Sequence, residues 1–186
     1  MIPKGPRLLW CLFFSLLYAC SSLPSSISAD RTTGSPLTEA YFSPHGSATE
    51  AVVRELDNAK QEIFVQAYSF TSAPIAKALV NAHKRGVKVT VVLDRSQRSV
   101  KYSSADFVVH SGIPTYIDAK HAIAHNKIMI IDGATLITGS FNFTKAAEEK
   151  NAENLLIIKG DAGLVNKYLA NFKAHLEHSE RYEGRD

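Results

Sequence analysis

The chain of 186 residues contains only two cysteines, Cys11 and Cys20, and both lie in its first twenty residues. A protein cut after residue 29 would therefore hold neither a disulfide nor a reactive thiol. Two catalytic strings are also missing, the G-x-x-x-x-G-K-[ST] phosphate loop and the G-x-S-x-G serine elbow. The sequence thus gives no support to P-loop nucleotide hydrolysis, serine esterase chemistry or thiol chemistry.

The first segment of the chain has the pattern of an export signal. Lys4 and Arg7 precede an apolar run from Leu8 to Ala19, and a Ser/Pro-rich stretch follows. The run is about 12 residues long, whereas a membrane-spanning helix needs about 20. We therefore expect a signal peptide over residues 1–29, cut at Ala29, and a periplasmic or secreted protein. The residues before Cys20 also resemble a lipoprotein box, so a lipid anchor on Cys20 is the alternative.

The net charge gives no indication of a partner. Removal of residues 1–29 takes away two basic residues, which leaves 19 against 18 acidic ones and reduces the charge from +3 to +1. A value so close to zero does not argue for nucleic acid. About 155 residues remain, which suits one domain with a sizeable core. We expect a linker over residues 30–39 and a single domain over residues 40–186.

Helical and extended patterns alternate along that domain. Apolar spacing predicts helices over residues 47–59, 72–86, 105–110 and 164–176, and Ser47-Ala48-Thr49-Glu50 has the form of a capping box. Short β-branched runs predict strands over residues 62–70, 87–93, 114–117, 126–131, 136–138 and 155–158. Asp132-Gly133 favours a tight hairpin turn between two of them. The sequence therefore predicts an α/β domain, a layered mixed β-sheet flanked by helices.

The residues suited to catalysis gather between His125 and Glu153. His125, Lys127 and Asp132 form the string H-x-K-x-x-x-x-D, and Gly139-Ser140-Phe141-Asn142 follows. Residues two apart on a strand share a face, so His125 and Lys127 project together, as Ser140 and Asn142 would in an extended segment. Phosphodiester cleavage needs an attacking group, stabilisation of charge on the phosphate oxygens and an acid for the leaving alkoxide. Imidazole can attack phosphorus, Lys127 supplies a positive charge, and Ser140 and Asn142 supply neutral donors to the phosphate.

Two carboxylates could hold the imidazole ring of His125 and stabilise its charged form. Asp132 has the opposite strand parity to His125 and lies at the turn, whereas Glu153 opens the last strand. Parity therefore favours Glu153 as the orienting residue. Asp132 is expected to brace the motif or to serve only as a turn residue.

The sequence resembles the phospholipase D superfamily, whose signature is HxKxxxxD followed by a Gly-Ser pair. The resemblance covers residues 41–186, includes the segments Ala67–Thr71, Ser111–Pro114 and Gly139–Glu148, and is closest to small bacterial periplasmic endonucleases with a single motif. It implies that the catalytic residues include His125 as nucleophile and Glu153 as its partner, and that no metal or cofactor takes part. It also implies a homodimer, in which the second acid is the motif histidine of another copy.

Three function classes stay open at this point. The first is an exported endonuclease that hydrolyses DNA or RNA through a phosphohistidine. The second is a phospholipase D that cleaves phosphatidyl headgroups, although such enzymes usually carry two HxKxxxxD motifs on a longer chain. The third is a non-catalytic exported binding module, for which a damaged motif would be expected. Strand preference, sequence preference and biological role do not follow from the motif.

Other polar residues carry weaker signals. His121 and His125 are four residues apart, which would suit zinc on a helix, but the segment leads into a strand and no H-E-x-x-H string accompanies it. We therefore expect no metal site. A polar loop could track nucleic acid or be ordinary surface; its residues are Arg95, Arg98, Lys101 and Tyr102. Ordinary solvated positions are expected for His45, His83, His110, His175, His178, Glu148, Glu149 and Lys150.

Overall fold

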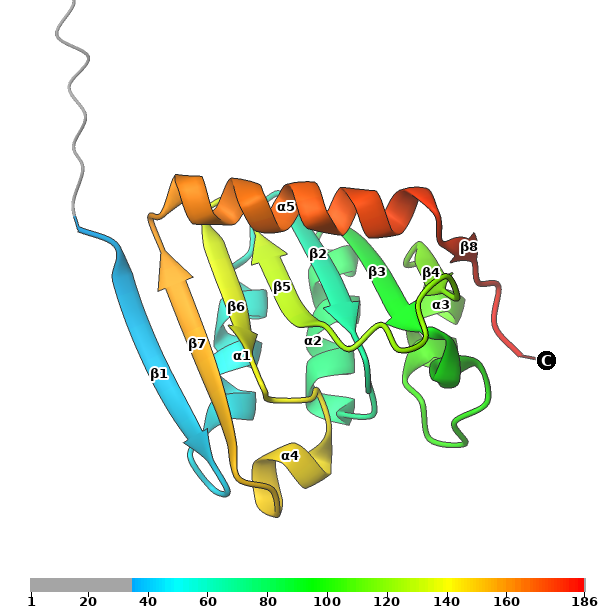
Figure 1. Cartoon of the computed structure of the whole chain (residues 1–186), viewed down its shortest axis with the longest axis horizontal. Coiled ribbons are helices and arrows are strands. Elements are labelled where there is room, and N and C mark those ends of the chain that lie inside the picture. Colours follow the sequence, from blue (N-terminus) through cyan, green and yellow to red (C-terminus); the bar gives the residue numbers. More distant parts are fainter. Residues whose placement is uncertain (1–34, 186) are drawn as a thin grey trace, which may run out of the picture. The chain divides into compact units, whose positions relative to one another are not determined.

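The structure, a computed structural model, describes residues 35–185. The predicted signal peptide, the Cys20 anchor and the first half of the linker lie outside these residues. The described part is a mixed sheet with helices on both of its faces (Figure 1), so the α/β fold expected from the sequence is confirmed. None of the helices within residues 35–185 has the length and apolar character to cross a bilayer.

The eight strands of the sheet are ordered β1-β7-β6-β5-β2-β3-β4-β8. β2, β3 and β4 are parallel to one another, and the other pairs are antiparallel. The strands are β1 (Leu37–Ser43), β2 (Glu62–Ala67), β3 (Lys88–Asp94), β4 (Thr115–Asp118), β5 (Lys127–Ile131), β6 (Thr135–Gly139), β7 (Glu153–Lys159) and β8 (Glu180–Arg181). The helices are α1 (Ala48–Asn58), α2 (Ala73–Lys84), α3 (Ala105–His110), α4 (Lys145–Glu149) and α5 (Ala162–Glu177), with a 3-10 turn, η1, at Arg95–Arg98.

Two apolar layers hold the sheet between its helices. On one face, α1, α2 and α3 cover the larger core, to which β3 contributes Val91 and Leu93. On the other face, α5 crosses the strands (Figure 1), and its Phe172 packs with Val92 of β3, with its ring 5.1 Å from that of Phe64. Alternate residues of one strand thus enter opposite cores. This burial on both faces explains why the central strands are apolar runs rather than alternating patterns.

The predicted hairpin at Asp132-Gly133 joins β5 to β6. Both residues have positive φ, 53° and 61°, as a type I′ turn requires. Glycine adopts this conformation freely, and aspartate tolerates it better than most side chains do. The hairpin fixes the register of β5 against β6, with Ile131 opposite Thr135.

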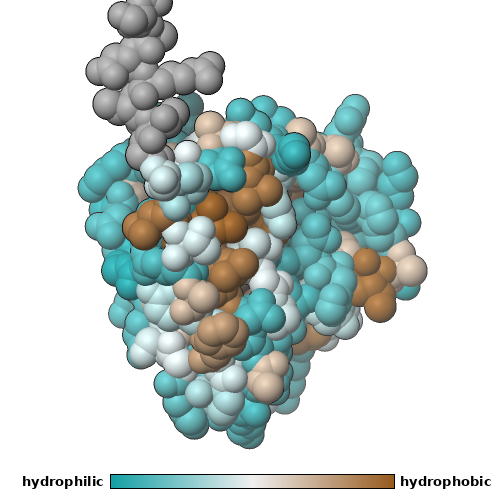
Figure 2. Space-filling view, turned by 60° about the vertical axis from the view of Figure 1, so that its left-hand side comes forward, coloured by the Kyte–Doolittle hydropathy of each residue, from teal (hydrophilic) through white to brown (hydrophobic). Residues whose placement is uncertain are grey.

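The strand β1 was not expected from the sequence. Residues 37–39, which were assigned to the linker, pair with β7, with Leu37 opposite Lys159. β1 forms one edge of the sheet and leaves Leu37 and Phe42 largely exposed. Figure 2 turns this edge forward and shows apolar side chains among the hydrophilic ones on this side of the molecule. β1 has no buried apolar face, since Leu37, Ala40 and Phe42 are exposed, so a search for core-facing patterns missed the strand.

The predicted capping box at the start of α1 is wrong. Ser47 adopts a left-handed conformation (φ 60°) and its side chain caps nothing. The carboxylate of Glu148 in α4 takes this place, because it accepts from the backbone N–H of Ser47 (3.1 Å) and of Thr49 (2.7 Å). A negative charge at a helix N-terminus also interacts favourably with the helix dipole. Glu148 is thus a structural residue and not the ordinary solvated side chain that the sequence suggested.

Candidate active site

The sheet topology brings four of the candidate site residues to one edge. β5 and β7 begin at the edge where β2 and β6 end, because β5 pairs antiparallel with β2 and β7 pairs antiparallel with β6. This is the lower edge of the sheet in Figure 1. His125 and Lys127 stand there at the start of β5, Ser140 follows β6, and Glu153 starts β7. Residues separated by up to 28 positions in the sequence therefore meet at one place.

His125 and Lys127 are in direct contact. The Lys127 ammonium donates to the backbone carbonyl of His125 (2.9 Å) and lies 3.2 Å from its Nδ1. The ring of Tyr68, just after β2, lies 4.5 Å from the imidazole and 5.3 Å from Lys127 Nζ, measured to ring centroids. Lys127 is only 6 % exposed, whereas His125 is exposed. A candidate nucleophile is thus accessible to solvent, beside a cation that is held in a fixed place.

Two opposing effects act on Lys127. Burial lowers the pKa of its ammonium, and the negative charge of Glu153 partly offsets this, so that the net direction is downward. Burial also removes water that would otherwise screen the charge, which strengthens its action on a nearby phosphate. Lys127 is therefore well placed to stabilise charge that develops on phosphate oxygens.

Glu153 acts on Lys127 by charge, and its Oε1 accepts from Asn151 Nδ2 at 3.1 Å. Among residues 35–185, no hydrogen bond joins Glu153 to His125. The Lys127 ammonium can donate to Nδ1 of His125 only while that atom carries no proton. Attack on phosphorus through Nε2 requires the proton to be on Nδ1. A protonated Nδ1 is a donor, so it needs a carboxylate as its partner in place of the Lys127 ammonium. The orienting role of Glu153 stays a prediction.

The Gly-Ser pair has a structural reason. Gly139 has φ 147°, and a Cβ atom at this position would lie 2.3 Å from the backbone oxygen of Asn154, so only glycine fits. Ser140 Oγ accepts from Asn154 N (3.0 Å) and Nδ2 (3.3 Å), which leaves its own proton available as a donor. Asn142 is half-buried, and its Oδ1 has no hydrogen-bond partner among the described residues. Both expected phosphate donors thus follow the same strand end.

Asp132 lies at the opposite end of β5. Its carboxylate accepts from the backbone N–H groups of Lys60 (2.8 Å), Gln61 (2.8 Å) and Glu62 (3.0 Å). Burial disfavours its charge, but these donors outweigh burial and hold the pKa of Asp132 below its usual value. Five steps along the strand place it about 16 Å from Lys127. Asp132, which the sequence grouped with the catalytic residues, is too far away to touch the same phosphate and instead fixes the turn to the start of β2.

The polar loop after β3 has mixed contacts. Arg98 pairs with Glu180 of β8 at 2.5 Å. Lys101 Nζ lies 5.6 Å from the ring centroid of Tyr102, whose side chain is 76 % exposed. Arg98 is thus paired with β8, whereas the side chains of Lys101 and Tyr102 are exposed.

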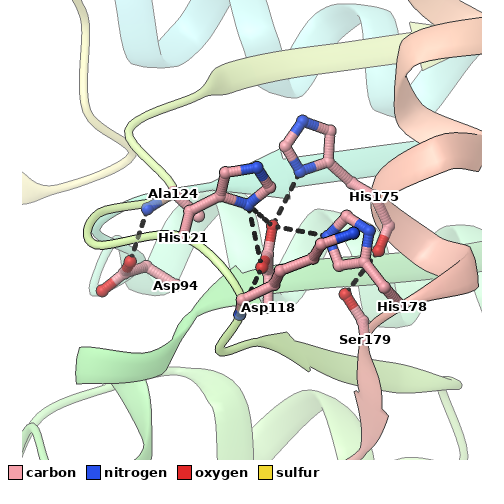
Figure 3. A network of polar contacts seen from close by, with 8 residues as sticks. Asp94, Asp118, His121, Ala124, His175, His178 and Ser179 are labelled. Carbon is pink, nitrogen blue, oxygen red and sulfur yellow. Dashed lines mark hydrogen bonds and ion pairs between the residues drawn. The ribbon is translucent and has the colours of Figure 1, made fainter.

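One group of residues was missed from the sequence. Asp118 at the end of β4 meets His121, His175 and His178, which extend toward it from the following loop and from the end of α5 (Figure 3). The expectation of solvated positions for His175 and His178 is wrong, because their side chains are only 13 % and 22 % exposed. The sequence carried a signal, since Asp118–His121 and His175–His178 are both spaced by three residues. By contrast, His45 and His110 are exposed as expected, and His83 is half-buried.

A family model described as "Cardiolipin synthase, PLD-like domain" matches residues 52–176 of this chain. The chain belongs to the phospholipase D superfamily, as the motif suggested. The match runs from within α1 to nearly the end of α5 and includes every residue of the HxKxxxxD string.

One relative is a phospholipase D of Rickettsia felis, which is 44 % identical over 131 residues. These residues make up 70 % of this chain and 65 % of the relative. The human mitochondrial cardiolipin hydrolase is 34 % identical over 131 residues, 70 % of this chain and 52 % of that protein. The matched region thus spans less than two thirds of the length of these relatives.

Two solved structures share the fold over their whole length. Nuc from Salmonella typhimurium, described as a phospholipase D family member, superposes with a TM-score of 0.78 at 39 % identity, covering 81 % of this chain and 100 % of Nuc. NucT from Helicobacter pylori gives a TM-score of 0.73 at 23 % identity, covering 80 % of this chain and 100 % of NucT. The likeness to NucT concerns the fold alone.

Proposed function

We propose that this protein is an exported, metal-independent phosphodiesterase, and specifically an endonuclease that hydrolyses DNA or RNA. The observation that carries the proposal is the exposed His125 beside the buried Lys127, at the strand edge that also presents Ser140 and Asn142. The sequence resemblance to small single-motif endonucleases favours a nucleic-acid substrate. Export rests on the signal-peptide pattern of residues 1–29.

The mechanism has two displacements at phosphorus. Nε2 of His125 attacks, a P–N bond forms, and the P–O bond to the leaving alkoxide breaks while an acid protonates that oxygen. Water then attacks the phosphohistidine while the group that acted as the acid, now deprotonated, takes a proton from the water. The P–N bond breaks, and the imidazole is regenerated. Lys127, Ser140 and Asn142 stabilise the charge on the remaining phosphate oxygens in both transition states.

The proposed active unit is a homodimer, because one chain lacks the second acid. His125 cannot attack and protonate the leaving oxygen at the same time. The side chain of His121 is turned toward the cluster at the end of β4, with its Nδ1 3.0 Å from Asp118 Oδ2. A two-fold axis would bring a second exposed His125 to the same phosphate.

Light scattering is expected to give twice the chain mass, and hybrid dimers of wild type with His125→Ala should be severely impaired. A monomer that keeps full specific activity at nanomolar concentration would contradict this.

A phospholipase D is the second candidate. Ile123, two residues before His125, is 57 % exposed, and an apolar side chain next to the site would suit a lipid surface. The Rickettsia and human relatives carry lipid-related names. This candidate shares every catalytic residue with the first, so only the substrate separates them.

The deciding experiment compares substrates on one preparation. Nicking and degradation of plasmid DNA are measured beside headgroup release from phosphatidylcholine and hydrolysis of cardiolipin in vesicles, with His125→Ala as the control for contaminating enzymes. Efficient plasmid cleavage with negligible lipid turnover supports the nuclease, and the reverse pattern supports a phospholipase D. If the folded protein hydrolyses none of these phosphodiesters, the non-catalytic binding module is the function class that remains.

Chelation tests the metal-independent step. In excess EDTA, the initial rate is expected to stay within about twofold, because Lys127 supplies the charge that a cation provides in metal-dependent enzymes. Complete loss, restored by one particular divalent ion in a protein that remains folded, would show that catalysis needs a metal.

A further inference from the structure

The cluster of Asp118, His121, His175 and His178 lies outside the catalytic edge just described. Asp118 ends β4, His121 is in the loop that follows, His175 belongs to the last turn of α5, and His178 directly follows that helix. Figure 3 shows the three imidazoles arranged around the carboxylate. Two segments more than fifty residues apart thus supply two members each.

The spacing of the cluster is that of a coordination shell. Asp118 Oδ2 lies 2.7 Å from His175 Nδ1, 3.0 Å from His121 Nδ1 and 3.4 Å from His178 Nε2. The four nearest ligand atoms lie within 4.8 Å of one another. Tetrahedral ligands at zinc–nitrogen and zinc–oxygen distances of about 2.0–2.1 Å are about 3.3 Å apart. Closing the widest separation, 4.8 Å, to about 3.3 Å requires each of the two atoms to move by about 0.75 Å, which small rotations of the histidine side chains can supply.

Hydrogen bonding alone leaves this cluster incomplete. The Asp118 side chain is fully buried, and its Oδ2 is the nearest acceptor for all three rings. His178 Nε2 is buried without a hydrogen-bond partner among the described residues, and such a group is costly. Protonation of all three rings does not solve this, because it places three positive charges around one carboxylate, with ring centroids 4.8–5.4 Å apart. A divalent cation satisfies three neutral imidazoles and the carboxylate together.

The composition of the cluster selects the class of ion. Three imidazole nitrogens and one carboxylate oxygen suit zinc and its neighbours, whereas magnesium and calcium prefer oxygen ligands only. A surface hollow of about 620 Å³ lies over the cluster and is lined also by Lys120 and Glu177. An ion from solvent therefore has a path to the four ligands.

From this geometry we infer that Asp118, His121, His175 and His178 form a structural site for a transition-metal cation of the zinc type. The bound ion ties the end of α5 to β4 and to the segment 119–126, which contains His125 and leads to β5. The same segment is anchored a second time, because the backbone N–H of Ala124 donates to Asp94 Oδ2 at 2.7 Å (Figure 3). The ion adds stability to this part of the fold, whereas the Ala124–Asp94 hydrogen bond keeps the segment in place without it. The ion takes no part in the reaction at phosphorus, so its removal should lower the melting temperature and leave the rate nearly unchanged.

The test uses metal binding and not nuclease activity. The purified protein is stripped with a chelator, titrated with Zn²⁺ by calorimetry, and melted with and without the ion. We expect one Zn²⁺ per chain with submicromolar affinity and a melting temperature raised by several degrees. Co²⁺ in its place should give the visible absorption of a tetrahedral complex.

Variants decide whether these four residues are the ligands. His121→Ala and His178→Ala each remove one ligand from a partly exposed side chain and should weaken Zn²⁺ binding by at least about 100-fold. His110→Ala, an exposed histidine on α3, is the matched control and should bind as wild type does. Circular dichroism of the stripped variants checks that they fold. Absence of Zn²⁺ binding by the wild type below about 1 mM, or unchanged binding by folded His121→Ala and His178→Ala, would overturn the inference.

Discussion

The two ends of β5 differ in what their side chains do. At the start, His125 is exposed and contacts a cation rather than the carboxylate expected for it. At the end, Asp132 has three backbone donors at 2.8–3.0 Å and joins the turn to β2. His125 and Asp132 are only seven positions apart, yet the first remains available to a substrate, whereas the hydrogen bonds of the second are already made within the protein. The first and last residues of the HxKxxxxD string need different experiments, because one acts on chemistry and the other on stability.

The largest expected effect is that of His125→Ala. Removal of the nucleophile should abolish hydrolysis, to at least about 10⁴-fold below wild type. Because the side chain is exposed, the free energy of unfolding should change by less than about 0.5 kcal/mol. Initial rates on a fluorescent DNA substrate and urea denaturation measure the two quantities. Residual turnover above a few per cent in a verified sample would remove His125 from the nucleophile role.

Lys127→Met follows in size. Methionine preserves much of the buried aliphatic stem and deletes the charge, so kcat should fall by at least about 10²- to 10³-fold. The KM for DNA should change much less, since the ammonium is proposed to act mainly in the transition state. Steady-state kinetics separate the two parameters. Lys101→Met, which removes an exposed lysine of the polar loop, is the control; an equal loss of kcat in both variants would argue against a special place for Lys127.

Glu153→Gln should reduce the rate severely and also shift its pH dependence. Glu153 raises the pKa of Lys127, against the lowering by burial. Loss of this carboxylate lowers that pKa further, so the ammonium deprotonates at a lower pH and the basic limb of the kcat profile moves to lower pH. Rates between pH 5 and 10 test the direction. A profile with an unmoved basic limb would show that Glu153 does not act through Lys127.

Asp132→Asn should have the smallest effect on chemistry. The amide keeps one acceptor oxygen but loses the negative charge that the N–H groups of Lys60, Gln61 and Glu62 stabilise, which should cost about 1–3 kcal/mol of unfolding free energy. The native pKa of Asp132 is lowered, so this contribution is complete above the unfolded pKa of about 3.9 and is lost as pH falls through the native value. In urea melts, the difference in unfolding free energy between the two proteins should therefore be smaller at pH 3 than at pH 7. A folded but inactive Asp132→Asn beside an active Glu153→Gln would reverse the two roles.

Local patterns in the sequence were sufficient for most of the fold. Residues 105–110 form α3 as predicted, and Asp132-Gly133 forms the expected turn, because helix periodicity and positive φ are properties of a few adjacent residues. The capping of α1 was not predictable in this way. Its carboxylate comes from Glu148, about a hundred residues further along the chain, and a nearby Glu50 offered a false local solution.

The candidate site divides in the same way. His125 and Lys127 lie side by side because strand parity places them together, and this could be deduced from the sequence. The contact of Nδ1 with Lys127 rather than Glu153 depends on how β7 lies against β6 and β5, which parity does not describe. The cluster around Asp118 was hidden for a related reason, since it exists only because α5 crosses the sheet and ends above β4. Contacts made by a long crossing helix have no local signature.

The crossing of α5 also has a consequence for how the chain folds. Its Val165 and Phe172 cover Val92, Ile130 and Leu136, which belong to three different strands. Until residues 162–177 arrive, one whole face of the sheet has no cover, and such apolar faces promote aggregation of incomplete chains. The helix is the last long element of the chain, and its contacts have large sequence separation, which slows folding. This face of the sheet is therefore completed only after residues 162–177 have been synthesised and have packed on it.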